Sequence, residues 1–503
     1  MNPTAATTPI KAARRARLGL YSIGHAQYWR QFPGLRDRLL GYGEFIASRL
    51  SEWGDVTYFG MVDREGLARE AADAFLARNV DLIFCHAATY AMSASHVALA
   101  QTCKRPIVVL NLQPCERMDY DRTTTGEWLA HCCACGVPEI ANAFTRAGVP
   151  FHVVSGLLGL DATPPDSLAD EDTANHSDAV AAWREIAEWA RAATVKRTLA
   201  TGRIGFLGHT YPGMLDMYSD FTMITAQTGL HVEILEMCDL NRILATVTDA
   251  EKQAKLDQVK EMFVISEDSP ADPLARKPRP EQLDIACAVA VAQEKLVREF
   301  DLDALTYYYR GAPGNPYERL QEAFILGHSL LTAQGIPCSG EGDTKTCVAM
   351  KICDTLGVGG SYSEIVAADF RDQTMLMGHD GPFHVGISAE KPILRGMGLY
   401  HGKWGTGVSV EAKVRRGPVT NLGVTQTRDG RLKMIVHEGE ATDGPTLKIG
   451  NTMTPVRFAE PPAQFMNAWF SHGPTHHFAM SVGHNAGVFR KVALLLDWPC
   501  EVL

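Results

Sequence analysis

The stretch of sequence that decides the fold is residues 340–381, which read GEGDTKTCVAMKICDTLGVGGSYSEIVAADFRDQTMLMGHDG. Its first part has the apolar periodicity of a helix, and from about residue 358 short alternating runs typical of strands replace it. The sequence therefore predicts α/β architecture before this point and a β-rich region after it.

The same stretch carries side chains that bind cations. Glu341 stands at the turn before the predicted helix, Glu364 lies in a predicted strand, and His379 directly follows an apolar run. The pair His476-His477 supplies further imidazoles later in the chain. Two carboxylates and two imidazoles match a divalent cation with mixed oxygen and nitrogen preference, and they leave coordination positions for a substrate.

Length and composition bound the possible classes of protein. With 503 residues the chain is too long for one core, so roughly three domains are expected. Its 46% hydrophobic and 21% charged residues are those of an ordinary globular protein. The net charge of −10 argues against nucleic-acid binding, and no run reaches the roughly 18 apolar residues of a membrane span. The N-terminus lacks the apolar segment of a signal peptide, which predicts a cytoplasmic protein without nucleic-acid or membrane partners.

Residues 18–156 alternate short β-branched runs with helix-length segments, the pattern of a doubly wound parallel sheet with helices on both faces. Ligands approach such sheets at the carboxyl ends of the strands. His25 and Gln27 follow the first predicted strand and are candidate site residues, although solvated loop residues are the more common case. The predicted strands are 18–24, 56–62, 80–86, 106–112 and 150–156, and the predicted helices lie near 36–52, 64–78, 91–102 and 126–147.

The polar, acidic and proline-bearing segment 161–177 is typical of a linker, and a second α/β run follows it. No G-x-G-x-x-G or P-loop fingerprint occurs in the chain, which argues against a nicotinamide oxidoreductase or an ATP-dependent kinase. The predicted strands of this run are 203–208, 231–237, 261–266, 304–310 and 336–340, and the predicted helices lie near 216–228, 239–258, 281–299 and 316–334.

Beyond about residue 358, alternating runs and glycine turns predict an antiparallel sheet or small barrel. A hairpin is expected at Arg428-Asp429-Gly430, and helices are expected at 461–470 and 485–496. The predicted domains are an N-terminal α/β domain over 1–165, a central α/β domain over 166–357 and a C-terminal β-rich domain over 358–503.

Twelve cysteines occur, and most lie in apolar periodic segments, so they are expected to be reduced and buried. The cluster Cys132-Cys133-Ala134-Cys135 has no second pair at the spacing of a zinc or iron–sulfur site. Helix packing is therefore preferred to metal binding for this cluster. The other cysteines expected to be buried include Cys85, Cys238, Cys287, Cys347 and Cys353.

The two glutamates differ in how strongly local sequence supports a function. Glu341 is bracketed by glycines at the carboxyl end of a predicted strand, whereas Asp343 fits the plainer role of complementing a helix dipole. Strand alternation places Glu364 on one face with Tyr362 and Val366. A carboxylate on such an apolar face is paired or coordinating, because burying it alone costs several kcal/mol.

A single histidine is more often a structural residue than a ligand. The adjacent His476 and His477 are expected to point to opposite sides of an extended segment, so only one of them would reach a metal. Separately these signals are weak, but together they form one ligand set.

In combination, the GEGDxKT motif at 340–346, the glutamate in SYSE, Met-Gly-His379 and the segment Thr-His-His-Phe resemble the L-arabinose isomerase family. This family belongs with the L-fucose isomerase-like ketol-isomerases. Its fold, two Rossmann-like α/β domains followed by a β-barrel-like domain, agrees with the order predicted from the patterns. The resemblance covers essentially the whole chain and implies a metal-dependent aldose–ketose isomerase, an intramolecular oxidoreductase of carbohydrate metabolism.

Residue by residue, the resemblance implies that Glu341, Glu364, His379 and His477 bind Mn²⁺, although other divalent cations are compatible. It makes Glu341 and Glu364 the acid/base pair that moves a proton between adjacent sugar carbons through an enediol(ate). It also implies a homo-oligomer whose active site lies near a subunit interface.

The loops that would hold the distal carbons of the sugar depart from the family pattern. Where the family has a TGSQHLYG-like loop, this chain has SIGHAQYW at 22–29. Where the family has a TTTFEDLHG loop, this chain has LTYYYRGAPGNP at 305–316. The sugar therefore stays open between L-arabinose, the family default, and L-fucose, D-galactose, D-arabinose or an unusual sugar. An epimerase or dehydratase on the same scaffold and a non-catalytic sugar-binding protein are the alternatives. The predicted substrate contacts are His25, Gln27, Tyr308 and His476.

Overall fold

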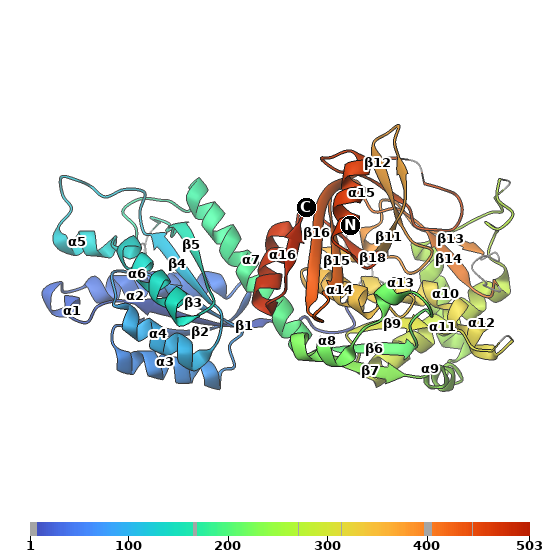
Figure 1. The fold of residues 1–503 in the computed structure, drawn as a ribbon, viewed down its shortest axis with the longest axis horizontal. Coiled ribbons are helices and arrows are strands. Elements are labelled where there is room, and N and C mark those ends of the chain that lie inside the picture. Colours follow the sequence, from blue (N-terminus) through green and yellow to red (C-terminus); the bar gives the residue numbers. More distant parts are fainter. Residues whose placement is uncertain (1–7, 164–167, 270, 313, 397–404, 445) are drawn as a thin grey trace. The chain divides into compact units, whose positions relative to one another are not determined.

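The structure is a computed structural model that describes residues 8–163, 168–269, 271–312, 314–396, 405–444 and 446–503. The chain divides into two compact units, one of Arg14–Arg197 and one of Met1–Ala13 with Thr198–Leu503. The predicted fold class is confirmed, with two parallel sheets flanked by helices and a closed antiparallel barrel toward the C-terminus (Figure 1). The three domain limits given above stay predictions, and positions 164–167 of the expected linker lie outside the described residues.

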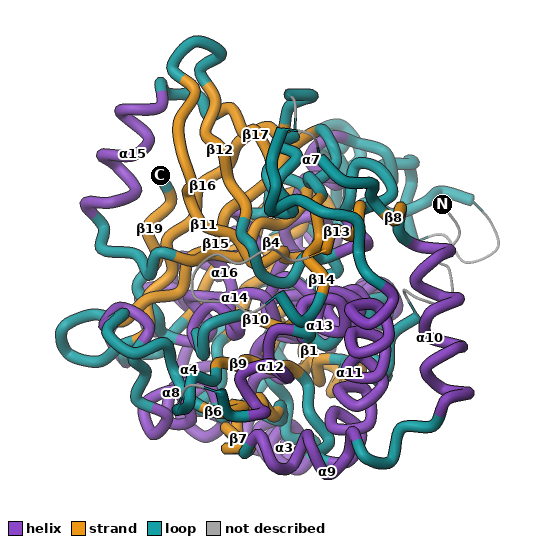
Figure 2. The backbone as a smooth tube through the Cα atoms, turned by 90° about the vertical axis from the view of Figure 1, so that its right-hand side faces the viewer, coloured by secondary structure: helices purple, strands orange, loops and turns teal. Residues whose placement is uncertain are grey.

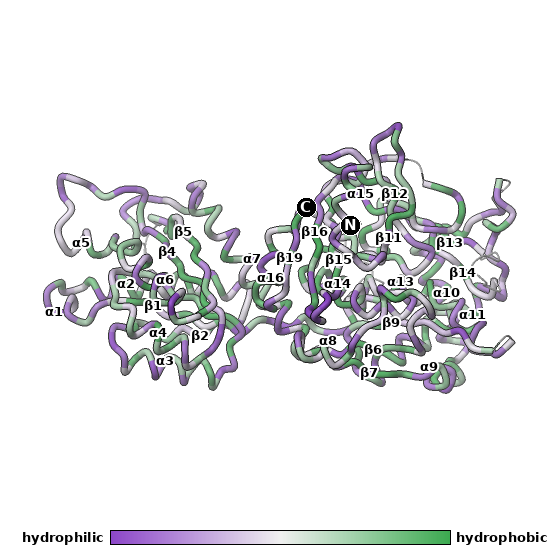
Figure 3. The backbone as a smooth tube through the Cα atoms, in the orientation of Figure 1, coloured by the Kyte–Doolittle hydropathy of each residue, from purple (hydrophilic) through white to green (hydrophobic). Residues whose placement is uncertain are grey.

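The unit Arg14–Arg197 is built on a five-stranded parallel sheet of order β2-β1-β3-β4-β5. β3 and β4 are apolar along most of their length and largely buried, as expected of strands with helices on both faces (Figure 3). The strands are β1 (Ala16–Ile23), β2 (Gly54–Val62), β3 (Leu82–His86), β4 (Ile107–Gln113) and β5 (Phe151–Leu157). The helices are α1 (Tyr28–Gln31), α2 (Leu35–Leu50), α3 (Glu65–Ala77), α4 (Ser93–Cys103), α5 (Thr125–Ala130), α6 (Cys133–Ala147) and α7 (Ser177–Ala200), which ends beyond this unit.

The other unit begins with a four-stranded parallel sheet of order β10-β9-β6-β7. Its strands are β6 (Arg203–Gly208), β7 (His231–Leu235), β9 (Ala304–Tyr308) and β10 (Cys338–Ser339). Its helices are η2 (Leu215–Met217), α8 (Phe221–Thr228), α9 (Met237–Leu244), α10 (Asp249–Met262), α11 (Pro280–Glu299), α12 (Pro316–Glu322), α13 (Phe324–Ala333) and α14 (Thr344–Thr355).

Six antiparallel strands close the barrel in the order β15-β18-β11-β12-β17-β16, because β15 pairs with both β18 and β16. Figure 2 labels five of them, β11, β12, β15, β16 and β17. The predicted hairpin is confirmed between β15 and β16, whose turn holds Asp429 and Gly430. The barrel strands are β11 (Gly359–Asp369), β12 (Thr374–Gly378), β15 (Gly417–Gln426), β16 (Leu432–Ala441), β17 (Thr454–Arg457) and β18 (His477–Val482). The neighbouring elements are η3 (Val385–Ile387), α15 (Pro462–Ser471), α16 (Ala486–Leu496) and β19 (Cys500–Val502), which pairs with β16.

Some predicted elements differ in the structure. The strand expected at 261–266 is only β8 (Val264–Ile265), and it pairs with β13 (Ile393–Gly396) beside β14 (Val408–Glu411) rather than joining the second parallel sheet. The helices expected at 126–147, 239–258 and 316–334 are each divided in two. At the second of these, Thr248 starts a new helix by forming a capping box with Glu251.

The cysteine prediction holds for Cys85, Cys287, Cys347 and Cys353, which are buried. Cys238 is exposed instead, because Met237, Leu240 and Ile243 form the buried face of its helix. In the Cys132–Cys135 cluster only Cys133 is buried.

Among the described residues, no helix combines the length and the apolar composition that crossing a membrane requires.

Candidate functional site

Glu341 lies in the tight turn between β10 and α14, and its backbone φ of +59° is a left-handed conformation that non-glycine residues rarely adopt. Gly342 follows with a φ of +71°, and a Cβ at this position would lie 2.6 Å from the His209 carbonyl oxygen. The Tyr211 N–H donates to the Glu341 carbonyl, and the Gly342 N–H donates to the Tyr307 carbonyl, both at 2.9 Å. These contacts hold the Glu341 carboxylate at the carboxyl edge of the parallel sheet.

Asp343 caps the N-terminus of α14 and also holds an imidazole. Its Oδ1 accepts a hydrogen bond from the Thr346 N–H at 3.0 Å, and its Oδ2 accepts one from the Thr346 hydroxyl at 2.8 Å. The same Oδ2 lies 3.0 Å from Nδ1 of His477, and both side chains are fully buried. Burial alone would raise the pKa of Asp343, but His477 and the charge of Lys345 hold this pKa below its usual value. Asp343 therefore does more than complement a helix dipole.

The register of three barrel strands brings the remaining ligand candidates together. Glu364 on β11 pairs with Gly378 on β12 on one side and with His477 at the start of β18 on the other. His379 directly follows β12, and its N–H donates to the Thr452 hydroxyl at 2.8 Å. Adjacent strands thus place a carboxylate and two imidazoles at one end of the barrel.

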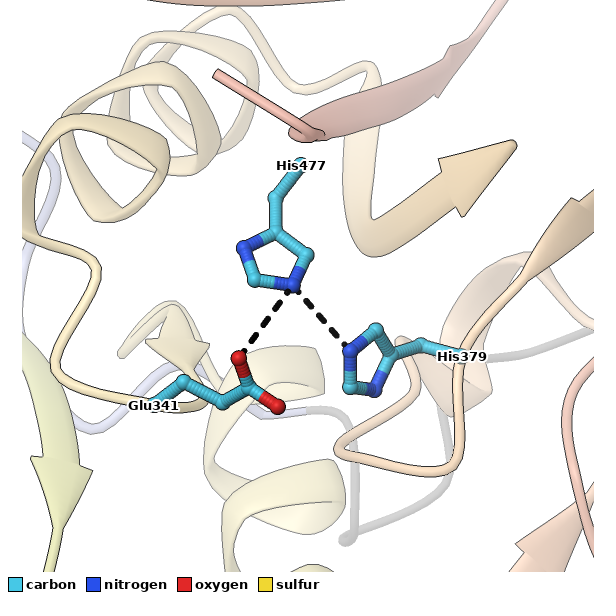
Figure 4. Close-up of side chains that lie close together, drawn as sticks. All are labelled: Glu341, His379 and His477. Atoms are coloured by element: carbon cyan, nitrogen blue, oxygen red, sulfur yellow. Dashed lines mark hydrogen bonds and ion pairs between the residues drawn. The ribbon is translucent and has the colours of Figure 1, made fainter. Parts of the chain in front are cut away.

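His477 is the centre of the resulting cluster (Figure 4). Its Nε2 lies 3.2 Å from Nε2 of His379 and 3.8 Å from Oε2 of Glu341. The ligand atoms of Glu341, His379 and His477 all lie within 4.8 Å of one another, and those of Glu364, His476 and His477 do so as well. The four predicted metal ligands therefore fall in two groups that share His477, and their role as ligands stays a prediction.

His476 also belongs to this cluster, and Asp216 of the α/β region orients its ring. Oδ2 of Asp216 accepts a hydrogen bond from the His476 N–H at 3.0 Å and lies 2.6 Å from its Nδ1. Nε2 of His476 is then 3.9 Å from Oε2 of Glu341. The expectation that His476 and His477 point to opposite sides is wrong, since their ring centroids are 3.8 Å apart. The reason is that β18 begins only at His477, which leaves His476 free to turn toward Asp216.

Burial and neighbouring charges shift the pKa values of several groups in the cluster. Burial is the largest influence on the pKa of Glu341 and raises it, against the opposing charges of His379 and His476. Burial lowers the pKa of His477 to about 3, despite its hydrogen bond with Asp343, so this imidazole is neutral at neutral pH. Burial would also lower the pKa of His379, but the neighbouring Asp380 and the two glutamates raise it above its usual value.

The cluster opens into a cavity of about 360 Å³, a size typical of small-molecule sites. Tyr308 lies on its wall, as predicted for a substrate contact, and its ring centroid is 4.4 Å from that of Tyr211. Polar groups that suit a hydroxylated ligand also line the cavity. They include Arg310, Glu318, Gln321, Asp380, Asn451 and Thr452.

The donor set fits a divalent cation. Oε2 of Glu341 is buried, and no described residue hydrogen-bonds to it, which is costly for a carboxylate unless a ligand satisfies it. Asp343 engages Nδ1 of His477, the usual arrangement of metal-binding histidines, and Nε2 is the nitrogen that would bind a cation. The Tyr362 hydroxyl lies 2.8 Å from this Nε2. Carboxylate oxygens and imidazole nitrogens together suit Mn²⁺ and similar ions.

Two predicted substrate contacts lie in the other compact unit. His25 follows β1, and its ring meets that of Tyr28 edge to face at a centroid distance of 5.0 Å. Gln27 precedes α1 as its N-cap residue. Contact of His25 and Gln27 with a sugar stays a prediction.

Sequence reasoning missed three aspartates that contact the imidazoles of the site. Asp216 is 260 residues away from His476, and no local pattern signals that pairing. The second role of Asp343 depends equally on tertiary contacts. Asp380 could have been found from the sequence, because it directly follows the candidate ligand His379. In the structure, Oδ1 of Asp380 lies 3.1 Å from Nδ1 of His379.

Comparison with known proteins gives a match to one family model. Residues 387–502 match the family described as L-fucose isomerase, C-terminal domain, which relates this part of the chain to L-fucose isomerase-like proteins. No curated protein matches the chain.

Two solved structures with weak similarity are periplasmic solute-binding proteins of ABC transporters. One, from Actinobacillus succinogenes with bound D-allose, shares 13% identity over 61% of this chain and 83% of its own, with a TM-score of 0.16. The other, from Agrobacterium vitis bound with α-D-tagatopyranose, shares 12% identity over 65% of this chain and 93% of its own, with a TM-score of 0.15. Such low TM-scores carry no argument about fold or function.

Proposed function

We propose that the protein is a metal-dependent aldose–ketose isomerase that works through an enediol(ate). The observation that carries this proposal is the gathering of two glutamates and three imidazoles in overlapping clusters, of which Glu341, Glu364, His379 and His476 line one small-molecule cavity. The match of residues 387–502 to the C-terminal domain of L-fucose isomerase supports the same class of reaction. The resemblance to L-arabinose isomerases, carried by the motifs around Glu341, Glu364, His379 and His477, points to a closely related enzyme.

The reaction transfers a proton between adjacent sugar carbons and moves another between their oxygens. Glu341 and Glu364 are the proposed acid/base pair: one takes the proton from carbon and returns it to the neighbouring carbon, and the other serves the hydroxyl. Burial raises the pKa of Glu341, which makes it a stronger base than an exposed glutamate. The buried surroundings of the cluster also limit the access of water to the transferred proton.

Glu341, Glu364, His379 and His477 would hold the cation, with Mn²⁺ as the first choice and other divalent ions compatible with the same donors. When bound, the cation stabilises the negative charge that develops on the substrate oxygens. Asp343 favours the tautomer of His477 in which Nδ1 carries the proton and Nε2 has the lone pair that would bind the cation.

The proposed substrate is a neutral aldose of the L-arabinose or L-fucose type. Tyr308 and His476, on the wall of the cavity, are its proposed contacts, since a phenol and an imidazole both hydrogen-bond to sugar hydroxyls. His25 and Gln27 are proposed to reach the sugar within a homo-oligomer whose active site lies near a subunit interface. A cytoplasmic location is part of the same proposal.

The test is a panel of pentoses and hexoses incubated in D₂O with and without Mn²⁺ and followed by NMR. We expect a ketose to form from at least one aldose only with the metal, with deuterium entering at the carbon that exchanges its proton. Glu341→Gln and Glu364→Gln should abolish turnover in folded protein. Glu440→Gln, on an exposed part of β16, is the matched control and should retain it. A normal rate in either site variant would refute the acid/base assignment, and a non-ketose product would favour an epimerase or dehydratase.

A further inference from the structure

The Cys132–Cys135 segment, which the proposed isomerase reaction does not use, holds two thiols that face each other. Cys132 is the N-cap residue of α6, and Cys135 lies in the first turn of this helix. Their sulfur atoms are 2.6 Å apart. Cys133, between them in sequence, instead points into the core of the unit, where it packs in one apolar cluster with Ile140 and Phe144.

This geometry is close to that of a disulfide. An S–S bond is about 2.0 Å long, so the two sulfurs need to approach by only about 0.6 Å. Both residues belong to the cap and first turn of one helix, and closure therefore leaves the buried Cys133 and the sheet in place. A Cys-x-x-Cys pair at the start of a helix is also the usual setting of an exchangeable dithiol.

Reagents in solution have access to the pair. Cys135 is exposed and Cys132 is partly exposed. Burial, followed by the hydrogen bond with Cys135, raises the pKa of the Cys132 thiol to about 12. Cys132 therefore remains a thiol at neutral pH, and the exposed Cys135 is the residue that begins an exchange reaction.

The pair also neighbours the loop that follows β1. Burial raises the pKa of Tyr28, and the nearby thiols of Cys132 and Cys135 raise this pKa further. The Tyr28 ring contacts that of His25. The dithiol thus lies at the edge of the sheet where ligands approach parallel strands.

We propose that Cys132 and Cys135 form a dithiol site that exchanges with small-molecule disulfides to give an intramolecular disulfide. The Cys135 thiol loses its proton to solvent and attacks one sulfur of the small disulfide, which releases one small thiolate. Cys132 then loses its proton and attacks the Cys135 sulfur, which displaces the second small thiolate. Two protein thiols are oxidised and one small disulfide is reduced to two thiols, so atoms and electrons balance. The exposed position of the pair makes the disulfide a readily reducible one.

The experiment uses the purified full chain in graded ratios of reduced to oxidised glutathione, followed by alkylation of free thiols, trypsin digestion and mass spectrometry. Cys132, Cys133 and Cys135 fall in one tryptic peptide, residues 123–146, because no lysine or arginine lies between Arg122 and Arg146. We expect this peptide to carry three alkyl groups under reducing conditions. Under oxidising conditions we expect one alkyl group and a peptide lighter by two hydrogen atoms.

Single serine variants identify the pair. Cys133→Ser is the matched control, which should still form the cross-link, whereas Cys132→Ser and Cys135→Ser should lose it. Circular dichroism and thermal unfolding of each variant limit the comparison to folded protein. The wild-type result decides independently of the variants: three alkyl groups at every glutathione ratio, or glutathione adducts without a cross-link, would overturn the proposal. Loss of the cross-link in Cys133→Ser alone would assign it to another pair and overturn it as well. None of these readouts depends on isomerase activity.

Discussion

Asp343→Asn is the most informative single substitution, because Asp343 acts only through other residues. An asparagine amide can keep one oxygen toward the Thr346 N–H and so preserve the cap of α14. The NH₂ group then replaces Oδ2, the oxygen that lies 3.0 Å from Nδ1 of His477 and accepts from the Thr346 hydroxyl. An NH₂ group cannot accept a hydrogen bond, so His477 loses the partner that fixes its tautomer.

The magnitude follows from the contacts that are lost. A hydrogen bond to a charged group contributes about 1.5–3 kcal/mol, and removal of a buried charge offsets part of that loss. We therefore expect the free energy of unfolding without metal to fall by about 1–2 kcal/mol. Loss of a carboxylate that supports a metal-binding histidine reduces metal affinity by about 10–100-fold.

The assay is a Mn²⁺ titration followed by electron paramagnetic resonance of the free ion, together with urea unfolding of the metal-free protein. Thr346→Ala is the matched control, since it removes the threonine hydroxyl and leaves the contact between Asp343 and His477. It should bind Mn²⁺ almost as tightly as the wild type. Wild-type Mn²⁺ affinity in folded Asp343→Asn would refute the role given to Asp343 and weaken the assignment of His477 as a ligand.

Three further substitutions test other parts of the structure. Asp216→Asn weakens the orientation of His476, so kcat should fall about tenfold, the equivalent of about 1.4 kcal/mol, with Mn²⁺ affinity nearly unchanged; an unchanged kcat would contradict this role. His328→Leu removes an imidazole whose pKa burial lowers to about 3. Between the unfolded-state pKa of about 6.5 and the folded-state pKa, only the unfolded chain binds this proton. The free energy of unfolding of the wild type should therefore fall by about 1.4 kcal/mol for each unit that the pH falls, and the variant should not show this loss. Urea midpoints that change in parallel across this pH range would refute the prediction. Gly342→Ala places a Cβ 2.6 Å from the His209 carbonyl at a φ of +71° and should cost about 2 kcal/mol, visible as a lower thermal midpoint; an unchanged midpoint would contradict the close approach.

The order of elements was predictable because buried strands and amphipathic helices leave local periodic patterns. Strands β1 to β5 and β6, β7 and β9 fall where alternation and β-branched runs place them. The barrel was foreseen only as one of two options, since closure depends on the pairing of β15 with both β16 and β18. Strand β8 was misassigned, because two extended residues carry no sign of which sheet they will join.

The candidate ligands could be picked out of the sequence for a different reason. Glu341 is marked by the glycines around a strained turn, and Glu364 is an acidic residue followed by the apolar run of β11. Such local conflicts between residue type and structure usually indicate function. Asp216 and Asp343 create no comparable conflict, because an aspartate in a loop or at a helix start is ordinary. Their roles exist only through tertiary contacts.

The tertiary contacts of Asp216 and Asp343 orient the adjacent imidazoles of His476 and His477. Nδ1 of His477 is held by Asp343 and Nδ1 of His476 by Asp216, which lie 134 and 260 residues earlier in the chain. With each Nδ1 engaged, both Nε2 atoms face Glu341, at 3.8 and 3.9 Å. The α/β region therefore sets the direction of two histidines that belong to the barrel segment. If His477 binds the cation and His476 contacts the substrate, the two aspartate variants should separate these roles: Asp343→Asn should lose metal affinity, and Asp216→Asn should lose turnover with the metal still bound. Equal loss of metal affinity in both variants would instead make His476 a second ligand.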